Sequence, residues 1–351
     1  MERIHNWTTR MGNAQRHGLS GETCKLPLEL AWKYNYGVYV WTGPVIEGER
    51  VYCTGTRAIA LDLRTGQLLW ENPTVRSFGY ASAAVGPDAL YICATAGLFA
   101  LNKNTGEIIF HVEANMLNSS PCIDGSTVFF LGEKEKRYYL FAVDTTTGKE
   151  KWKFEGNKGL HQTPSVYDGL VIFGNGPTVR ALDINSGTLR WSHTFDAIKV
   201  RDTILVLDGK VFVSVEGEAL YAMDAHSGDI RWTFEYKLGS HCSPCLSSGK
   251  EFLIIATKKL HALDITTGKE IWQSKEFGFH ETNPISVGDL IFIGGGHYNY
   301  VYGFHQSNGD KVWEFPTDDI IFSSPAFANS SLVIGSHDGY IYCFRSSDLG
   351  T

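Results

Sequence analysis

One motif recurs along the 351-residue chain at intervals of 39 to 42 residues, and it constrains the fold more than any other feature. Clear copies read ALDLRTGQLLW, ALDINSGTLRW and ALDITTGKEIW. A repeat of about 40 residues with strand-like composition is typical of a β-propeller blade, which buries its apolar faces only against neighbouring blades. The seven copies end at Trp70, Phe110, Trp152, Trp191, Trp232, Trp272 and Trp313.

Each copy predicts a hairpin that joins the two outer strands of a blade. An apolar strand leads into Asp-x-x-Thr-Gly or a near variant, and a second strand ends in the aromatic residue. The Asp and Thr side chains can bond to nearby backbone amides of a tight turn, and the glycine can adopt a positive φ. Two more apolar strands precede each motif, as in TPSVYDGLVIFGN. Four strands per repeat follow.

The two ends of the chain predict an eighth blade. After Trp313 the sequence supplies three further strands and then stops. The missing outer strand is expected at the other end, because Trp32 in LELAWKYNYG is in phase with the series. An N-terminal strand that completes the last blade would close the ring and remove free sheet edges. The expected fold is all-β, an eight-bladed propeller of four-stranded antiparallel blades.

The motif Ala-x-Asp-x-x-Thr-Gly-x-x-x-Trp resembles the tryptophan-docking repeat of the pyrroloquinoline quinone (PQQ)-like propellers. The resemblance runs from about Trp32 to the C-terminus and implies that each tryptophan packs on the alanine and glycine of the next blade's motif. Phe110 and Gly303 depart from the pattern, which predicts weaker single dockings there. Residues 1–26 are similar to the lead-in segment of such propellers, so the expected organisation is that segment followed by one propeller domain over 27–351.

The resemblance does not carry over the activity of the quinoprotein dehydrogenases, because a shared fold does not determine function. Those enzymes stack the quinone against adjacent cysteines, and this sequence contains no Cys-Cys pair. We therefore expect no cofactor. A second relative in the family is the propeller lipoprotein that scaffolds outer-membrane barrel assembly. The start of this chain shows neither a signal peptide nor a lipid-attachment cysteine, which predicts a cytoplasmic protein.

Composition narrows the classes of partner. A formal net charge of −7 argues against a nucleic-acid or anionic-membrane surface. Cys53 and Cys93 occupy equivalent repeat positions, as do Cys122 and Cys245, so they are interpreted as small buried residues rather than disulfides. Cys242 and Cys245 should point to opposite faces of a strand, which argues against a metal or redox pair.

The repeat allows one structural position to be compared in all eight blades. We aligned the innermost strands on their Ser/Thr-Pro step, with Ala84 and Ile204 standing in for proline, and took the residue three positions earlier. A purely structural position would keep one small or apolar type. Instead the position is aromatic in the last and first blades and polar or ionisable over five others. Its occupants are Trp41, Ala81, Asn118, His161, Arg201, His241, Glu281 and Phe322.

These residues are expected to converge at one mouth of the channel. Aromatic Trp41, Tyr80 and Phe322 would form an apolar wall facing the ionisable residues, a mixture that suits a ligand or catalytic site. The predicted catalytic residues are His161 or His241 as general base, Glu281 as its partner or as the acid, and Arg201 to bind a carboxylate or an oxyanion. The predicted substrate-binding residues are Trp41, Tyr80, Asn118, Gln162, Asp202, His280 and Phe322.

Two other interpretations of these channel-mouth residues stay open. The ionisable residues can be a hydrogen-bonded belt that ties blades together, since polar groups in a water-filled channel cost little. His161, His241 and Glu281 can also hold a metal ion, although Arg201 between the two histidine blades would repel a cation. Both alternatives use the same residues as the enzyme hypothesis.

Two functions therefore remain. The first is a small-molecule site, with quinone-independent acid–base chemistry of the lyase, isomerase or cyclase type on a substrate with an apolar or aromatic part. The alternative is a non-catalytic scaffold that binds a protein partner through its rim, resembling the propeller subunit of the barrel-assembly machinery. The uneven residue types at the channel mouth, aromatic on one side and ionisable on the other, favour the first function. The absence of a known catalytic signature favours the second.

Overall fold

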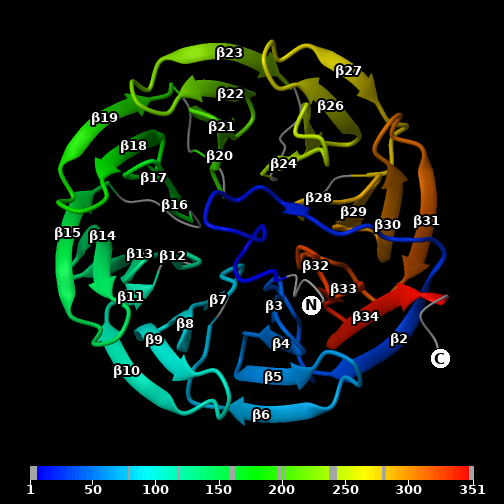
Figure 1. The fold of residues 1–351 in the computed structure, drawn as a ribbon, viewed down its shortest axis with the longest axis horizontal. Coiled ribbons are helices and arrows are strands. Elements are labelled where there is room, and N and C mark those ends of the chain that lie inside the picture. The colour runs from blue at the N-terminus through cyan, green and yellow to red at the C-terminus, as the bar shows by residue number, and fades with distance from the viewer. Residues whose placement is uncertain are drawn as a thin grey trace.

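The computed structural model describes residues 6–77, 79–116, 119–157, 163–196, 200, 203–236, 243–278 and 282–347. Eight antiparallel sheets lie around a central axis as the blades of a propeller, as predicted (Figure 1). No helix among these residues has the length and apolar character needed to cross a bilayer.

Each blade contributes four strands, ordered from the axis outward. The innermost strands are β3 (Val45–Glu47), β7 (Ala84–Val85), β12 (Cys122–Asp124), β16 (Ser165–Tyr167), β20 (Leu205–Leu207), β24 (Cys245–Leu246), β28 (Ile285–Val287) and β32 (Ala326–Ala328). The second strands are β4 (Arg50–Cys53), β8 (Ala89–Ala94), β13 (Thr127–Lys134), β17 (Leu170–Asn175), β21 (Lys210–Val215), β25 (Phe252–Ala256), β29 (Leu290–Gly294) and β33 (Ser331–Gly335).

The outer half of each blade carries the motif. The third strands are β5 (Ala58–Asp62), β9 (Gly97–Asn102), β14 (Arg137–Asp144), β18 (Thr178–Asp183), β22 (Ala219–Asp224), β26 (Leu260–Asp264), β30 (Tyr300–His305) and β34 (Tyr340–Ser346). The outermost strands are β6 (Leu68–Asn72), β10 (Ile108–Glu113), β15 (Glu150–Gly156), β19 (Leu189–Thr194), β23 (Ile230–Glu235), β27 (Glu270–Gln273), β31 (Lys311–Pro316) and β2 (Leu28–Asn35). Two short strands, β1 (Leu19–Ser20) and β11 (Asn115–Met116), are additional and pair with β28 and β13.

The last blade contains both ends of the chain, as predicted. Its strand order is β2-β34-β33-β32, so the N-terminal strand completes the C-terminal sheet. Strand β2 pairs with β34 in antiparallel register from Leu28 opposite Ser346 to Asn35 opposite Tyr340. The eight sheets therefore form a closed ring, which Figure 1 shows as red β34 beside blue β2.

The motif turns have the predicted chemistry. In the first blade the Asp62 carboxylate accepts hydrogen bonds from the amide and hydroxyl of Thr65, at 2.7 and 2.6 Å. Gly66 follows with a φ of +73°, a region that residues with a Cβ resist. A methyl group at this glycine would lie 2.6 Å from the Trp32 ring, so the bare backbone is the floor on which the preceding blade's tryptophan docks.

Tryptophan docking links the blades in series. Seven indole N–H groups donate to a backbone carbonyl of the next blade, at 2.8 to 3.3 Å. Trp313 donates to the Leu28 carbonyl at 3.0 Å and so carries the series across the join between the chain ends. Phe110 packs on Gly148 but has no donor to offer. There the Tyr91 hydroxyl donates to the Thr145 carbonyl at 2.8 Å and replaces the missing bond.

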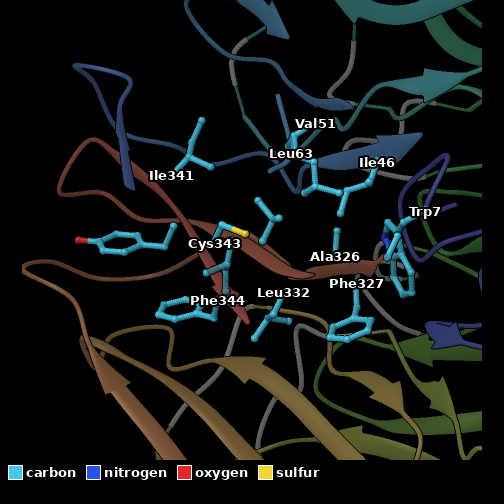
Figure 2. Packing of buried hydrophobic residues seen from close by; sticks show 14 of the residues in the cluster. Trp7, Ile46, Val51, Leu63, Ala326, Phe327, Leu332, Ile341, Cys343 and Phe344 are labelled. Atoms are coloured by element: carbon cyan, nitrogen blue, oxygen red, sulfur yellow. The ribbon is translucent and has the colours of Figure 1, made fainter. Parts of the chain in front are cut away.

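The cores lie between neighbouring blades. Figure 2 shows part of the cluster at the join, where Trp7 lies with Ile46 and Phe327 inside the ring. The predicted buried cysteines Cys53, Cys93, Cys122 and Cys245 are all at most 2% exposed. Burial raises the pKa of each of these thiols, so they act as small apolar side chains.

The N-terminal segment, defined here as residues 6–22, runs across the central channel and follows the inner edge of the ring (Figure 1). The innermost strand of a propeller leaves backbone groups unpaired toward the axis, and this segment pairs them. Amides of Ile46, Val85, Val166, Val206, Leu246 and Ser286 donate to carbonyls of Trp7, Thr8, Ala14, Gln15, His17 and Gly18, at 2.7 to 3.2 Å.

The third and eighth blades are held by side chains of the N-terminal segment. The Glu22 carboxylate accepts hydrogen bonds from the amides of Asn329 and Ser330, at 2.7 and 2.8 Å. The buried Arg16 guanidinium donates to the carbonyls of Pro121 and Pro164 in adjacent blades. The N-terminal segment thus touches all eight blades and crosses the channel.

Candidate functional site

A belt of hydrogen bonds surrounds the channel just above the N-terminal segment. Small polar residues two positions before the innermost strands link successive blades through an amide and a side-chain oxygen, at five joins among the described residues. The Ser243 amide donates to Asn283 Oδ1 at 2.8 Å, and the Asn283 amide donates to Ser324 Oγ at 3.1 Å. Equivalent bonds run from Thr203 to Ser243 and from Ser120 to Thr163. The belt fixes which residue of each blade lies at a given height.

This register corrects the sequence alignment in the second blade. The Ser82 amide donates to Ser120 Oγ at 2.9 Å, so Ser82 belongs to the belt. Strand β7 begins at Ala84, whereas the other innermost strands begin directly after the proline position, which makes Ala83 the proline equivalent. Ala81 was therefore assigned wrongly to the mouth position. Tyr80 occupies it, two residues above the belt like Trp41 and Phe322.

The predicted apolar wall is brought together at the mouth. The Trp41 ring stacks on Phe322 with centroids 5.2 Å apart and an interplanar angle of 14°. It meets Tyr80 edge-on at 5.4 Å. Phe322, Trp41 and Tyr80 come from the last, first and second blades, so one continuous cluster of aromatic side chains lies on that side of the channel.

Two residues that sequence reasoning missed complete this aromatic cluster. His337 lies in the turn after β33, 4.1 Å from the Trp41 centroid and 4.9 Å from Phe322. Tyr39 stacks on His337 at 5.1 Å and is 62% exposed. A comparison of the turns after the second strands could have found the histidine, because Thr56 and Gly176 occupy the equivalent place in other blades.

His337 lies in an unusual environment for an imidazole. Its side chain is 6% exposed, and among the described residues its Nε2 has no hydrogen-bond partner. Burial lowers the pKa of His337 below the ordinary value, while the nearby carboxylates of Asp319 and Asp338 oppose the shift. The ring is therefore neutral near pH 7 and packs as an aromatic group.

The N-terminal segment supports the aromatic wall from below. Arg10 is 5% exposed and donates from Nη1 to the Tyr80 carbonyl at 2.6 Å. The Arg16 guanidinium in turn donates to the Arg10 carbonyl at 2.9 Å. The N-terminal segment thus forms a hydrogen-bonded layer beneath the aromatic wall.

The polar and ionisable residues predicted to face the aromatic wall lie outside the described residues. This holds for every proposed catalytic residue and for most of the proposed substrate-binding residues. The acid–base assignments and the belt and metal alternatives for these side chains stay predictions. The positions concerned are Asn118, His161, Gln162, Arg201, Asp202, His241, His280 and Glu281. Within the described ranges no three His, Cys, Asp or Glu side chains gather as a metal site.

The cysteines described by the structure do not fit a bound quinone. Such a group needs an accessible sulfur platform at the mouth, and five of the six described cysteines are buried. Cys242 lies outside the described residues. Cys53, Cys93, Cys122, Cys245 and Cys343 are each buried within a different blade. We derive no chemistry through that cofactor.

Comparison with known proteins identifies the family. The model described as "Outer membrane protein assembly factor BamB" matches residues 29–134, 54–204 and 140–348, which together span nearly the whole chain. The chain belongs to this PQQ-like propeller family. One relative of this chain is the assembly factor BamB of Yersinia pestis, which is 22% identical over 86% of this chain and 83% of that protein. The serine/threonine-protein kinase AfsK of Streptomyces griseus is 24% identical over 76% of this chain, but over 33% of its own length.

Solved structures agree on the fold of this PQQ-like propeller. BamB from Moraxella catarrhalis superposes with a TM-score of 0.74 at 17% identity, covering 93% of this chain and all of that one. A europium-containing methanol dehydrogenase superposes with a TM-score of 0.83 at 13% identity, covering 98% of each chain. One ring architecture thus accommodates both an assembly factor and an enzyme, so the site has to decide the function.

Proposed function

We propose that this protein is a non-catalytic scaffold that binds a protein partner on the face of the ring carrying the channel mouth. The observation that carries the proposal is a cluster of aromatic rings on that face, continuous over the seventh, eighth and first blades, in which Phe322 and His337 are buried and Tyr39 is exposed. It runs from Tyr39 through His337, Trp41 and Phe322 to His297, with successive ring centroids 4.1 to 5.3 Å apart.

Exposure of this surface supports a protein partner. Val38 and Tyr39 are 41% and 62% exposed, and Tyr298 beside His297 is 49% exposed. Aromatic residues are enriched at protein interfaces and dominate their hot spots. A monomer without partners gains nothing from leaving these groups in water.

The relatives support the same direction. Assembly factors matched over most of both chains are named for a role in assembling other proteins, which makes a component of a protein-assembly machinery the favoured partner. The N-terminal segment also crosses the channel, which supports contact at the face of the ring rather than inside it. The cytoplasmic location predicted from the sequence stays a prediction.

Native mass spectrometry of the tagged protein, purified from the cells that produce it, tests this function. The scaffold predicts a species heavier than the tagged 39.0-kDa chain by the mass of a whole polypeptide, in the same stoichiometry in every preparation. The tagged chain carrying only a small-molecule mass would instead support the acid–base enzyme and sink the scaffold.

A further inference from the structure

A cavity of about 230 Å³ lies beside the aromatic cluster. Its walls come from the segment before β3, the β4–β5 turn and the segment before β7, including Tyr39, Trp41, Thr56 and Ser77. Pockets that enclose cofactors and drug-sized ligands measure about 300 to 1,000 Å³. The cavity is smaller than that range, and its size suits one large side chain.

The walls are held in place before anything binds. The Thr42 hydroxyl donates to the Thr54 carbonyl at 2.7 Å, and the Ser77 amide donates to the Gly55 carbonyl at 2.7 Å. Trp41 is fixed on its other sides by the aromatic cluster. A preformed cavity binds with little loss of conformational entropy, which favours its use as a recognition site.

His337 behind the cavity indicates that the cluster is more than core. An imidazole with an unpaired, buried nitrogen is less stable than a phenylalanine ring of similar shape. Chains keep such groups mainly at functional sites, where local stability is given up. His337 packs against both Tyr39 and Trp41, the two aromatic residues that line the cavity.

The charge near the cavity indicates which residue should stand next to the side chain that enters it. The carboxylates of Asp319 and Asp338 act on the pKa of His337, and the Asp318 amide donates to Asp338 Oδ2 at 3.1 Å, so three acidic residues gather on the last-blade side of the aromatic cluster and form what we call the acidic rim. Among the described residues no lysine or arginine forms an ion pair with them. On the opposite rim Arg57 is paired with Glu71 at 3.3 Å. An incoming segment with a lysine or arginine on the last-blade side would therefore be attracted.

We propose that this cavity anchors one aromatic side chain of an extended segment of the partner protein, with a lysine or arginine one or two residues away above the acidic rim. This inference rests on the proposed scaffold function and names the site through which it acts. An aromatic anchor fits because the cavity offers both a ring face and ring edges for stacked or edge-on contact.

A random 12-residue peptide display library, panned on the full-length protein, tests this site even while the partner is unidentified. The expected result is a consensus of one Phe, Tyr or Trp with an adjacent Lys or Arg. A synthetic peptide of that consensus should bind Tyr39→Ala at least about tenfold more weakly by fluorescence anisotropy. Leu69→Ala, which removes a 47% exposed apolar side chain on the outermost strand β6, should change its affinity less than about twofold.

The acidic rim has its own variant. Asp318→Asn combined with Asp319→Asn should weaken the peptide about threefold to tenfold and flatten its salt dependence. No consensus, or a consensus peptide indifferent to Tyr39→Ala, would overturn the anchor site. If the polypeptide complex seen by native mass spectrometry survives Tyr39→Ala unchanged, the anchor site is wrong while the scaffold function stands.

Discussion

Replacement of Arg16 by alanine should destabilise the whole ring, because its guanidinium joins blades from inside. The side chain is fully buried and donates five hydrogen bonds. Its acceptors are the Thr9 hydroxyl and the carbonyls of Arg10, Pro121 and Pro164, at 2.6 to 3.3 Å. Arg16→Ala leaves these four oxygens without this donor in a place water enters poorly.

The size of the effect follows from two opposing contributions. Hydrogen bonds to a charged group contribute about 1.5 to 3 kcal/mol each and are not additive. Burial of the guanidinium opposes this by several kcal/mol, as it does for buried ion pairs. We expect a net loss of about 3 to 5 kcal/mol, the range observed when one partner of a buried charged contact is removed. Arg16→Lys should lose about half as much, since one ammonium cannot span two carbonyls of adjacent blades.

Urea denaturation and hydrogen exchange measure this prediction together. The inner-edge amides of Val166 and Val206, which donate to the N-terminal segment, should exchange faster in Arg16→Ala than amides of the outer strands. Arg190→Ala is the control, because that arginine is exposed and pairs with Asp183 at 2.7 Å, a contact worth about 1 kcal/mol or less. Equal denaturation midpoints for the two variants, with unchanged exchange at the inner edge, would refute the reasoning.

Three further predictions concern the docking girdle and the aromatic cluster. Tyr91→Phe should lower the unfolding free energy by about 1 to 2 kcal/mol, because Tyr91 supplies the donor to the Thr145 carbonyl that Phe110 cannot supply. Tyr52→Phe should cost less in the same denaturation assay, because the carbonyl that Tyr52 contacts still accepts from Trp70. Gly187→Ala should lower the melting temperature by several degrees, because Gly187 has a φ of +69° and a Cβ there would lie 2.6 Å from an indole ring; a change within error would contradict the docking model. Burial lowers the pKa of His337, so the unfolded chain binds more protons than the folded chain and the unfolding free energy should fall as the pH drops below 6.5. In denaturation curves recorded across this range, His337→Phe should reduce the dependence of the unfolding free energy on pH. The same pH dependence in both proteins would show that His337 is not its source.

Much of the fold could be predicted because its signals are local and repeated. The Asp and Thr of the turn, the positive-φ glycine and the docking tryptophan all lie within one motif, so each copy reports its own hairpin. The same phase placed Trp32 in the last blade and predicted ring closure. Compensation for Phe110 was not predictable, since Tyr91 is on another strand and reaches the carbonyl only in three dimensions.

The path of the N-terminal segment could not be predicted for a physical reason. It contacts six of the blades through its backbone carbonyls, as at Thr8, Ala14 and Gly18, and such contacts leave no side-chain pattern in the sequence. The positions of two mouth residues could be predicted, while the roles assigned to them stay predictions. Trp41 and Phe322 were found because proline marks their register, whereas two alanines in the second blade hid the correct alignment by one residue.

Site-specific photo-crosslinking in living cells tests the central claim, that the face at the channel mouth binds a protein, most directly. A photoreactive residue replaces Tyr39 in one strain and Asp88, in the β7–β8 turn on the opposite face, in another. The account predicts the same polypeptide adduct in every experiment at position 39 and none at position 88. Adducts at both positions alike, or only at position 88, would contradict it.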